Sequence, residues 1–147
     1  MVLKQAVNVS STTAKHTVGQ IWEDRSAGKA YQYIVAGAAL AVGEAVSIAP
    51  ATFTAALTTK ALVDAQHAVG VVVVAIASGS FGWVQIEGTA SCKLLVNCAQ
   101  DVSLYSSATP GALDDDPTSQ TRIRGIVLLA TITTAGVYPC YLMRPAA

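Results

Sequence analysis

Hydrophobic residues in this chain fall in short runs of four to eight, separated by glycine, proline, serine and aspartate. Such runs predict strands bounded by turns, and no window shows the spacing of an amphipathic helix. We therefore predict an all-β fold, with a single β-sandwich or β-barrel domain. The expected strands cover residues 31–35, 45–48, 71–77, 81–87, 91–96, 102–105, 125–132 and 137–143.

Part of this pattern returns about 55 residues later. Residues 45–48 and 70–75 are similar in order and spacing to residues 101–104 and 125–130, and each set leads into a hairpin that contains glycine. Two related β units would explain the repeat. Chains rich in Val, Ala and Gly also align with themselves easily, so the sequence alone leaves both explanations open.

The first 29 residues differ in composition from the rest. Residues 8–17 are mostly polar, and residues 23–29 hold most of the local charge. This composition is typical of a leader outside a core. We predict an extended N-terminal arm over residues 1–29 and a β domain over residues 30–147, since 147 residues fit one domain.

The charge balance excludes several partners. Nine Lys and Arg oppose nine Asp and Glu, giving zero net charge, and charged residues make up 12% of the chain. Without a basic run, a nucleic-acid partner is not expected, whereas weak self-repulsion favours association between copies. Glycines interrupt the apolar stretches 34–48 and 68–84, so no membrane span is expected. Residues 1–10 do not resemble a secretory signal, which predicts assembly in a cytoplasm.

Residues that could carry chemistry are few. The two histidines, His16 and His67, lie outside any recognisable nucleophile motif, and no phosphate-binding glycine motif occurs. A pair of Cys92 with His67 is the only nucleophile arrangement to consider, and nothing in the spacing supports it. We expect no catalytic residue and no cofactor. The three cysteines, an odd number without a C-x-x-C pair, are expected to be reduced and packed as small apolar side chains.

Turn residues mark the segment between residues 109 and 117. Pro110 followed by Gly111 predicts a type II turn, because glycine accepts a positive φ at the third position. Asp114, Asp115 and Asp116 offer oxygen ligands for a cation. Three adjacent aspartates followed by proline are more typical of a solvated turn, so no metal site is predicted.

Aromatic residues are the best candidates for binding a partner, because they are enriched at protein interfaces. Packing in the core is the alternative explanation. The predicted partner-binding residues are Lys4, Trp22, Tyr31, Tyr33 and Trp83.

Four segments in order resemble small β-rich virion proteins of tailed bacteriophages, the capsid decoration (cement) or head proteins. These segments are residues 79–88, 101–105, 110–117 and 125–127, and the resemblance extends over residues 30–145. It implies a structural protein of the capsid exterior, often a homotrimer, whose partner is the major capsid protein.

On this hypothesis, residues 1–29 lie along the capsid or a neighbouring subunit, and residues 71–76 and 125–130 form the core or the trimer interface. A fibre-like virion module that stacks glycans on Trp83 and nearby tyrosines is the alternative. An enzyme with unrecognised chemistry ranks last, because no nucleophile and base can be nominated.

Overall fold

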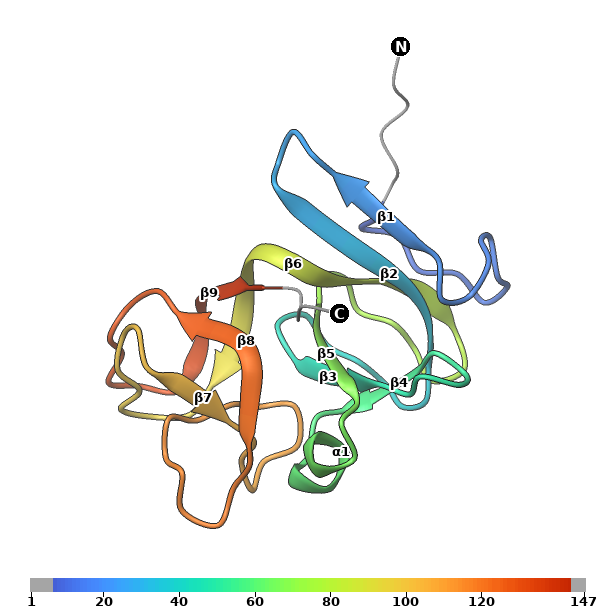
Figure 1. The fold of residues 1–147 in the computed structure, drawn as a ribbon. Helices are drawn as coiled ribbons and strands as arrows, with labels where there is room; N and C mark the ends of the chain where they lie inside the picture. Colours follow the sequence, from blue (N-terminus) through green and yellow to red (C-terminus); the bar gives the residue numbers. More distant parts are fainter. Residues whose placement is uncertain (1–6, 144–147) are drawn as a thin grey trace.

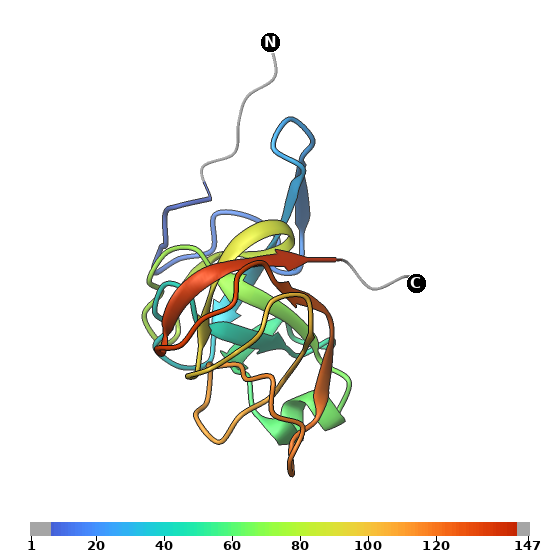
Figure 2. The same cartoon turned by 90° about the vertical axis from the view of Figure 1, so that its left-hand side faces the viewer.

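The computed structural model describes residues 7–143 and confirms the all-β class. Within this range, nine strands form one continuous sheet and one short helix accompanies them. The sheet curls into two neighbouring units, and β6 runs from the first unit into the second (Figures 1 and 2). The elements are β1 (Ile21–Asp24), β2 (Lys29–Ala36), β3 (Ala45–Ile48), β4 (Thr54–Leu57), α1 (Lys60–Asp64), β5 (Ala68–Val72), β6 (Phe81–Leu94), β7 (Ser103–Tyr105), β8 (Arg122–Leu128) and β9 (Gly136–Leu142).

The first unit is a closed five-stranded barrel. Its strands pair in the order β2, β4, β3, β5 and β6, and β6 pairs back onto β2 to close the ring. All of these pairs are antiparallel except β2 with β4, which is parallel. β1 pairs with β2 only and therefore lies beside the barrel as an added strand.

The second unit repeats this order with the remaining strands. The later half of β6 pairs with β9, β9 with β8, and β8 with β7. Bridges from Tyr105 to Asp114 (antiparallel) and from Leu94 to Leu113 (parallel) close this ring through residues 113–114. The later half of β6 therefore corresponds to β2, β7 to β3, residues 113–114 to β4, β8 to β5, and β9 to the first half of β6.

Backbone hydrogen bonds repeat at the same places. The amide of Gly43 donates to the carbonyl of Val72 at 2.9 Å, and the amide of Asp101 donates to the carbonyl of Leu128 at 3.0 Å. Gly43 and Asp101 both have a positive φ, at 89° and 61°. β3 and β7 thus occupy equivalent positions, but Asp101 corresponds to Gly43 and Ser103 to Ala45, so the predicted match of residues 45–48 with residues 101–104 is two residues out of register.

Each unit has its own hydrophobic core. Ile34, Val46, Val72 and Val84 are among the buried residues that fill the first barrel. The second core contains Leu94, Leu104, Leu113, Leu128 and Leu142, together with Ala45, Val63 and Val71 of the first unit. Because this core includes side chains from both units, the two pack as one body.

Residues 21–29 do not form part of a separate arm. β1 pairs antiparallel with β2, from Ile21 opposite Gln32 to Asp24 opposite Lys29, and the predicted boundary after residue 29 falls within β2. Asp24 Oδ1 accepts hydrogen bonds from Ser26 Oγ at 2.7 Å and from the amide of Ala27 at 3.3 Å. The local charge therefore belongs in part to a hairpin turn, which projects from the body of the molecule (Figure 1).

Other elements differ from the predicted pattern: β4 was not predicted, and the strand expected over residues 71–77 is β5, which ends at Val72. Residues 81–94 form one strand rather than two, and α1 occupies a window in which no helix was expected. Thr59 caps this helix, since its hydroxyl accepts from the amide of Leu62 at 3.4 Å, and Lys60 pairs with Asp64 one turn later at 2.7 Å. The predicted turn at Pro110 is confirmed: Gly111 has φ 81°, and the amide of Ala112 donates to the carbonyl of Thr109 at 3.1 Å.

Gly88 is the residue at which β6 passes from one unit to the other. Glu87 is its last residue to pair with β2, and Gly88 is the first to pair with β9. Gly88 has φ 94°, and a Cβ atom there would lie 2.6 Å from the carbonyl oxygen of Gly28. Only glycine combines this conformation with such a close approach of two backbones.

Gly88→Ala is therefore expected to lower the free energy of unfolding by about 3 kcal/mol, from backbone strain and the clash together. Gly79→Ala is the matched control, because Gly79 has φ 80° but a Cβ atom added there would meet no other atom within 4 Å. The free energy of unfolding of this variant should fall only by the backbone strain, about 1–2 kcal/mol. Urea unfolding measures both, and equal losses would contradict a special role for Gly88.

Candidate functional site

The outer face of the first unit carries a cluster of aromatic side chains. Tyr33 and Trp83 lie opposite each other on β2 and β6, with ring centroids 5.0 Å apart, and Tyr31 lies one pair further along β2. Alternation along the strands places these side chains outside the barrel, while Ile34 and Val84 point into it. All three aromatic residues are nevertheless buried, with Tyr33 2% and Trp83 1% exposed.

The chain's own N-terminal segment, residues 7–20, covers this cluster. The ring of His16 lies 5.1 Å from that of Tyr33 and 5.2 Å from that of Trp83, and Val7 and Val18 pack against the cluster. The amide of Lys15 donates to the hydroxyl of Tyr33 at 3.0 Å. A polar segment can lie over this aromatic face because its backbone supplies a partner for the buried hydroxyl of Tyr33, while its imidazole packs against the rings.

Backbone hydrogen bonds hold the segment at both of its ends. Ser11 and Phe81 exchange two of them, at 2.9 and 2.8 Å. The amide of Gly19 donates to the carbonyl of Tyr33 at 2.7 Å, and the carbonyl oxygen of Gly19 accepts from Gln32 Nε2 at 3.1 Å. Residues 7–20 are thus part of the folded domain.

The predicted partner-binding residues therefore have different surroundings. Tyr31, Tyr33 and Trp83 come together but lie beneath residues 7–20, and Trp22 is half-buried and stacks on Tyr31 at 5.8 Å. Lys4 lies outside the described residues. Contact of these residues with a partner stays a prediction, and the burial of Trp83 leaves no open indole face for a sugar in this conformation.

The coverage by residues 7–20 can be tested with the two tryptophans. In Trp22→Phe, fluorescence comes from Trp83 alone, and we expect blue-shifted emission that acrylamide quenches weakly because the indole is buried. In the matched variant Trp83→Phe, the half-buried Trp22 should be quenched more strongly. Equal quenching in the two variants would contradict the coverage of Trp83.

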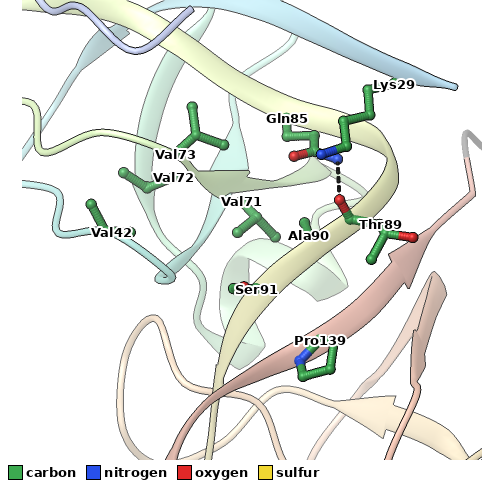
Figure 3. Close-up of a pocket in the computed structure, with 10 residues that line it drawn as sticks. All are labelled: Lys29, Val42, Val71, Val72, Val73, Gln85, Thr89, Ala90, Ser91 and Pro139. Carbon is green, nitrogen blue, oxygen red and sulfur yellow. Dashed lines mark hydrogen bonds between the residues drawn. The ribbon is translucent and has the colours of Figure 1, made fainter. Parts of the chain in front are cut away.

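A pocket of about 340 Å³ lies where the outer faces of the two units meet (Figure 3). The side chain of Gln85 lies at one side, and its Nε2 donates to the carbonyls of Glu87 and Thr89, both at 2.9 Å. Lys29 is the charged residue of the lining, and aliphatic side chains dominate the rest. The lining residues are Lys29, Val42, Val71, Val72, Val73, Gln85, Thr89, Ala90, Ser91 and Pro139. This chemistry suits an apolar contact rather than a reaction.

Of the residues considered for catalysis, His16 and Cys92 take part in packing. His16 contacts the aromatic cluster, His67 follows α1, and Cys92 is fully buried in the core of the second unit. All three cysteines are free and buried, which confirms their predicted packing. Burial raises the pKa of the Cys98 thiol to about 11, and a hydrogen bond with Cys140 together with burial raises the pKa of Cys92. Cys92 and Cys98 thus stay protonated near neutral pH and are poor nucleophiles.

The predicted solvated turn over residues 114–116 is found only in part: Asp114 forms the bridge to Tyr105 and is partly buried, as is Asp115, while Asp116 is exposed. Asp114 Oδ1 accepts from the amide of Asp115 at 2.8 Å and from Cys98 Sγ at 3.5 Å. Asp115 Oδ2 accepts from the amide of Ala99 at 2.8 Å, and Asp116 Oδ1 from that of Thr118 at 2.9 Å. The ligand atoms of Cys98, Asp114 and Asp115 lie within 4.8 Å of one another, but these hydrogen bonds already give each carboxylate a structural role.

A second apolar surface lies on the outer face of the second unit. Val137, Pro139 and Tyr141 point outwards from β9, and Leu129 follows β8 beside them. Val137 is 49%, Tyr141 42% and Leu129 38% exposed. Val42 lines the pocket and continues the surface towards it. The next residue, Gly43, lies close to β9, since a Cβ atom added there would be 3.0 Å from the side chain of Val137. Such a contiguous apolar surface is typical of a protein contact.

Comparison with protein-family models, curated proteins and solved structures finds no match to this chain. Within residues 7–143, the helix is too short to be a candidate for crossing a bilayer. The candidate site is therefore defined by its geometry: the pocket between the units and the apolar outer face of the second unit.

Proposed function

We propose that this protein is a structural component of a phage head, a decoration or cement protein that binds the exterior of the capsid shell. The exposed apolar outer face of the second unit is the observation that carries the proposal, because it offers a contact surface on a tightly closed all-β body. The resemblance of residues 30–145 to small virion proteins supplies the class of partner, the major capsid protein.

The organisation of the interior supports a role in binding rather than in chemistry. Among the described residues, every buried side-chain nitrogen and oxygen has a hydrogen-bond partner, as Ser47 and Thr58 have in each other at 3.1 Å. A satisfied interior makes a rigid scaffold, which loses little conformational entropy when it binds. The absence of enzymatic activity stays a prediction.

A cement protein stabilises a shell by burying surface across the boundaries between capsid subunits. Binding only to the assembled lattice shifts the equilibrium towards the intact shell by mass action. A homo-oligomer, for which a trimer is favoured by the resemblance, would contact several subunits at once and gain affinity through effective concentration. Zero net charge fits a contact governed by apolar burial.

The direct test is co-sedimentation of the purified protein with emptied capsid shells of its phage. We expect saturable binding at a fixed ratio to the major capsid protein, and a higher temperature of shell disruption. Shells of an unrelated phage are the control and should leave the protein in the supernatant. Failure to bind the cognate shell at micromolar concentrations would overturn the proposal.

A further inference from the structure

The pocket between the two units contains a buried amide with an unused hydrogen-bond acceptor. Gln85 is only 2% exposed, and its Nε2 donates to the carbonyl oxygens of Glu87 and Thr89. Only the amide nitrogen can donate to two carbonyls, so these bonds fix the orientation of the group. Its Oε1 accepts no hydrogen bond from residues 7–143. Since no enclosed side-chain oxygen in this range lacks a partner, Oε1 reaches the open space of the pocket.

A cation lies on the same side of the pocket. Lys29 is the charged residue of the lining, and Figure 3 shows its side chain beside that of Gln85. The ammonium group of Lys29 forms no ion pair with any carboxylate of residues 7–143. An ammonium group without a counter-charge, at the edge of an apolar pocket, favours a ligand with an anionic group.

The rest of the pocket is mainly aliphatic. Val71, Val72 and Val73 line it from β5 and the residue that follows, and Val42 and Pro139 complete the apolar walls. The volume of about 340 Å³ lies at the lower end of the range for pockets that bind small ligands. Such walls favour a compact aliphatic group, because its burial removes apolar surface from water.

A matching ligand therefore carries a carboxylate for Lys29, a hydrogen-bond donor for Gln85 Oε1 and an aliphatic group for the valines. The last residue of a polypeptide has a free carboxylate, an amide N–H and a side chain on one Cα atom. We infer that this pocket binds an aliphatic carboxyl-terminal residue of a polypeptide partner, in the orientation that these three contacts set. The inference does not depend on the capsid role.

Titration of the full-length protein with the peptide acetyl-alanyl-alanyl-leucine tests this binding in ¹H–¹⁵N correlation spectra. The amide signals of Val72, Ala90 and Ser91 should shift in a saturable way. The same peptide with a carboxyl-terminal amide lacks the negative charge and should bind about 10-fold more weakly. A depsipeptide, in which an ester oxygen replaces the last N–H, should bind about 5-fold more weakly because Gln85 Oε1 loses its donor.

Lys29→Met removes the cation and keeps an apolar side chain of similar length. This variant should bind the carboxylate and amide peptides equally, because the group that distinguishes them is gone. Lys60→Met is the matched control: Lys60 lies on α1, outside the pocket lining, and this variant should keep the preference for the carboxylate.

The inference would be overturned if millimolar peptide produced no saturable shift at the pocket. Equal binding of the carboxylate and amide peptides to the wild type would also overturn it, as would a preference that Lys29→Met retains. Failure of the protein to bind capsid shells, with peptide binding intact, would remove the capsid role alone.

Discussion

The structure depends on one strand that two units share. The first half of β6 closes the barrel by pairing with β2, and its later half begins the second unit by pairing with β9. Neither ring of hydrogen bonds is complete without this strand. Because each ring is closed, its strands have no free edge, and the added strand β1, which pairs with β2 only, is where a sheet edge stays unpaired. Side chains are therefore the main means of contact that the two rings offer to partners.

The shared strand also sets which surfaces are available. The first unit has residues 7–20 ahead of it, from which the amide of Lys15 donates to the hydroxyl of Tyr33 and the ring of His16 lies against Tyr33 and Trp83. The second unit has no such leader, because β6 enters it directly. Its outer face keeps valine, leucine and tyrosine side chains in contact with solvent, and the pocket beside Gln85 extends the apolar surface towards the first unit. The geometry of one strand thus connects the fold to a surface suited to assembly.

Local patterns in the sequence predicted much of the fold. Residues 45–48 form a strand, as expected from a short apolar run that ends before Pro50. The turn predicted from Pro110 and Gly111 is present, and Gly111 has the positive φ that glycine accepts. The helix at residues 60–64 was missed because its apolar face is a single turn long, too short for a periodic pattern. Two strands were expected at residues 81–87 and 91–96, whereas the conformation of Gly88 allows one strand to continue into the next unit.

The candidate site was less predictable, because it depends on contacts between distant residues. Tyr33 and Trp83 were predicted to bind a partner, with packing in the core as the alternative, and the sequence could not show that His16 lies against both rings. Val7 and Val18, apolar residues within a polar segment, were the one sign that this segment packs on something. The repeat of about 55 residues left two related units and chance self-alignment both open, and the open face became apparent only through the pairing of β6 with both β2 and β9.

The most direct measurement of the central claim is methyl cross-saturation by nuclear magnetic resonance, in a mixture of methyl-labelled, deuterated protein with unlabelled, protonated capsid shells. Saturation of the shells should attenuate the methyl signals of Val127, Leu129 and Val137 and leave those of Val9 unchanged. Attenuation confined to Val9, or an equal response at all four residues, would contradict the account.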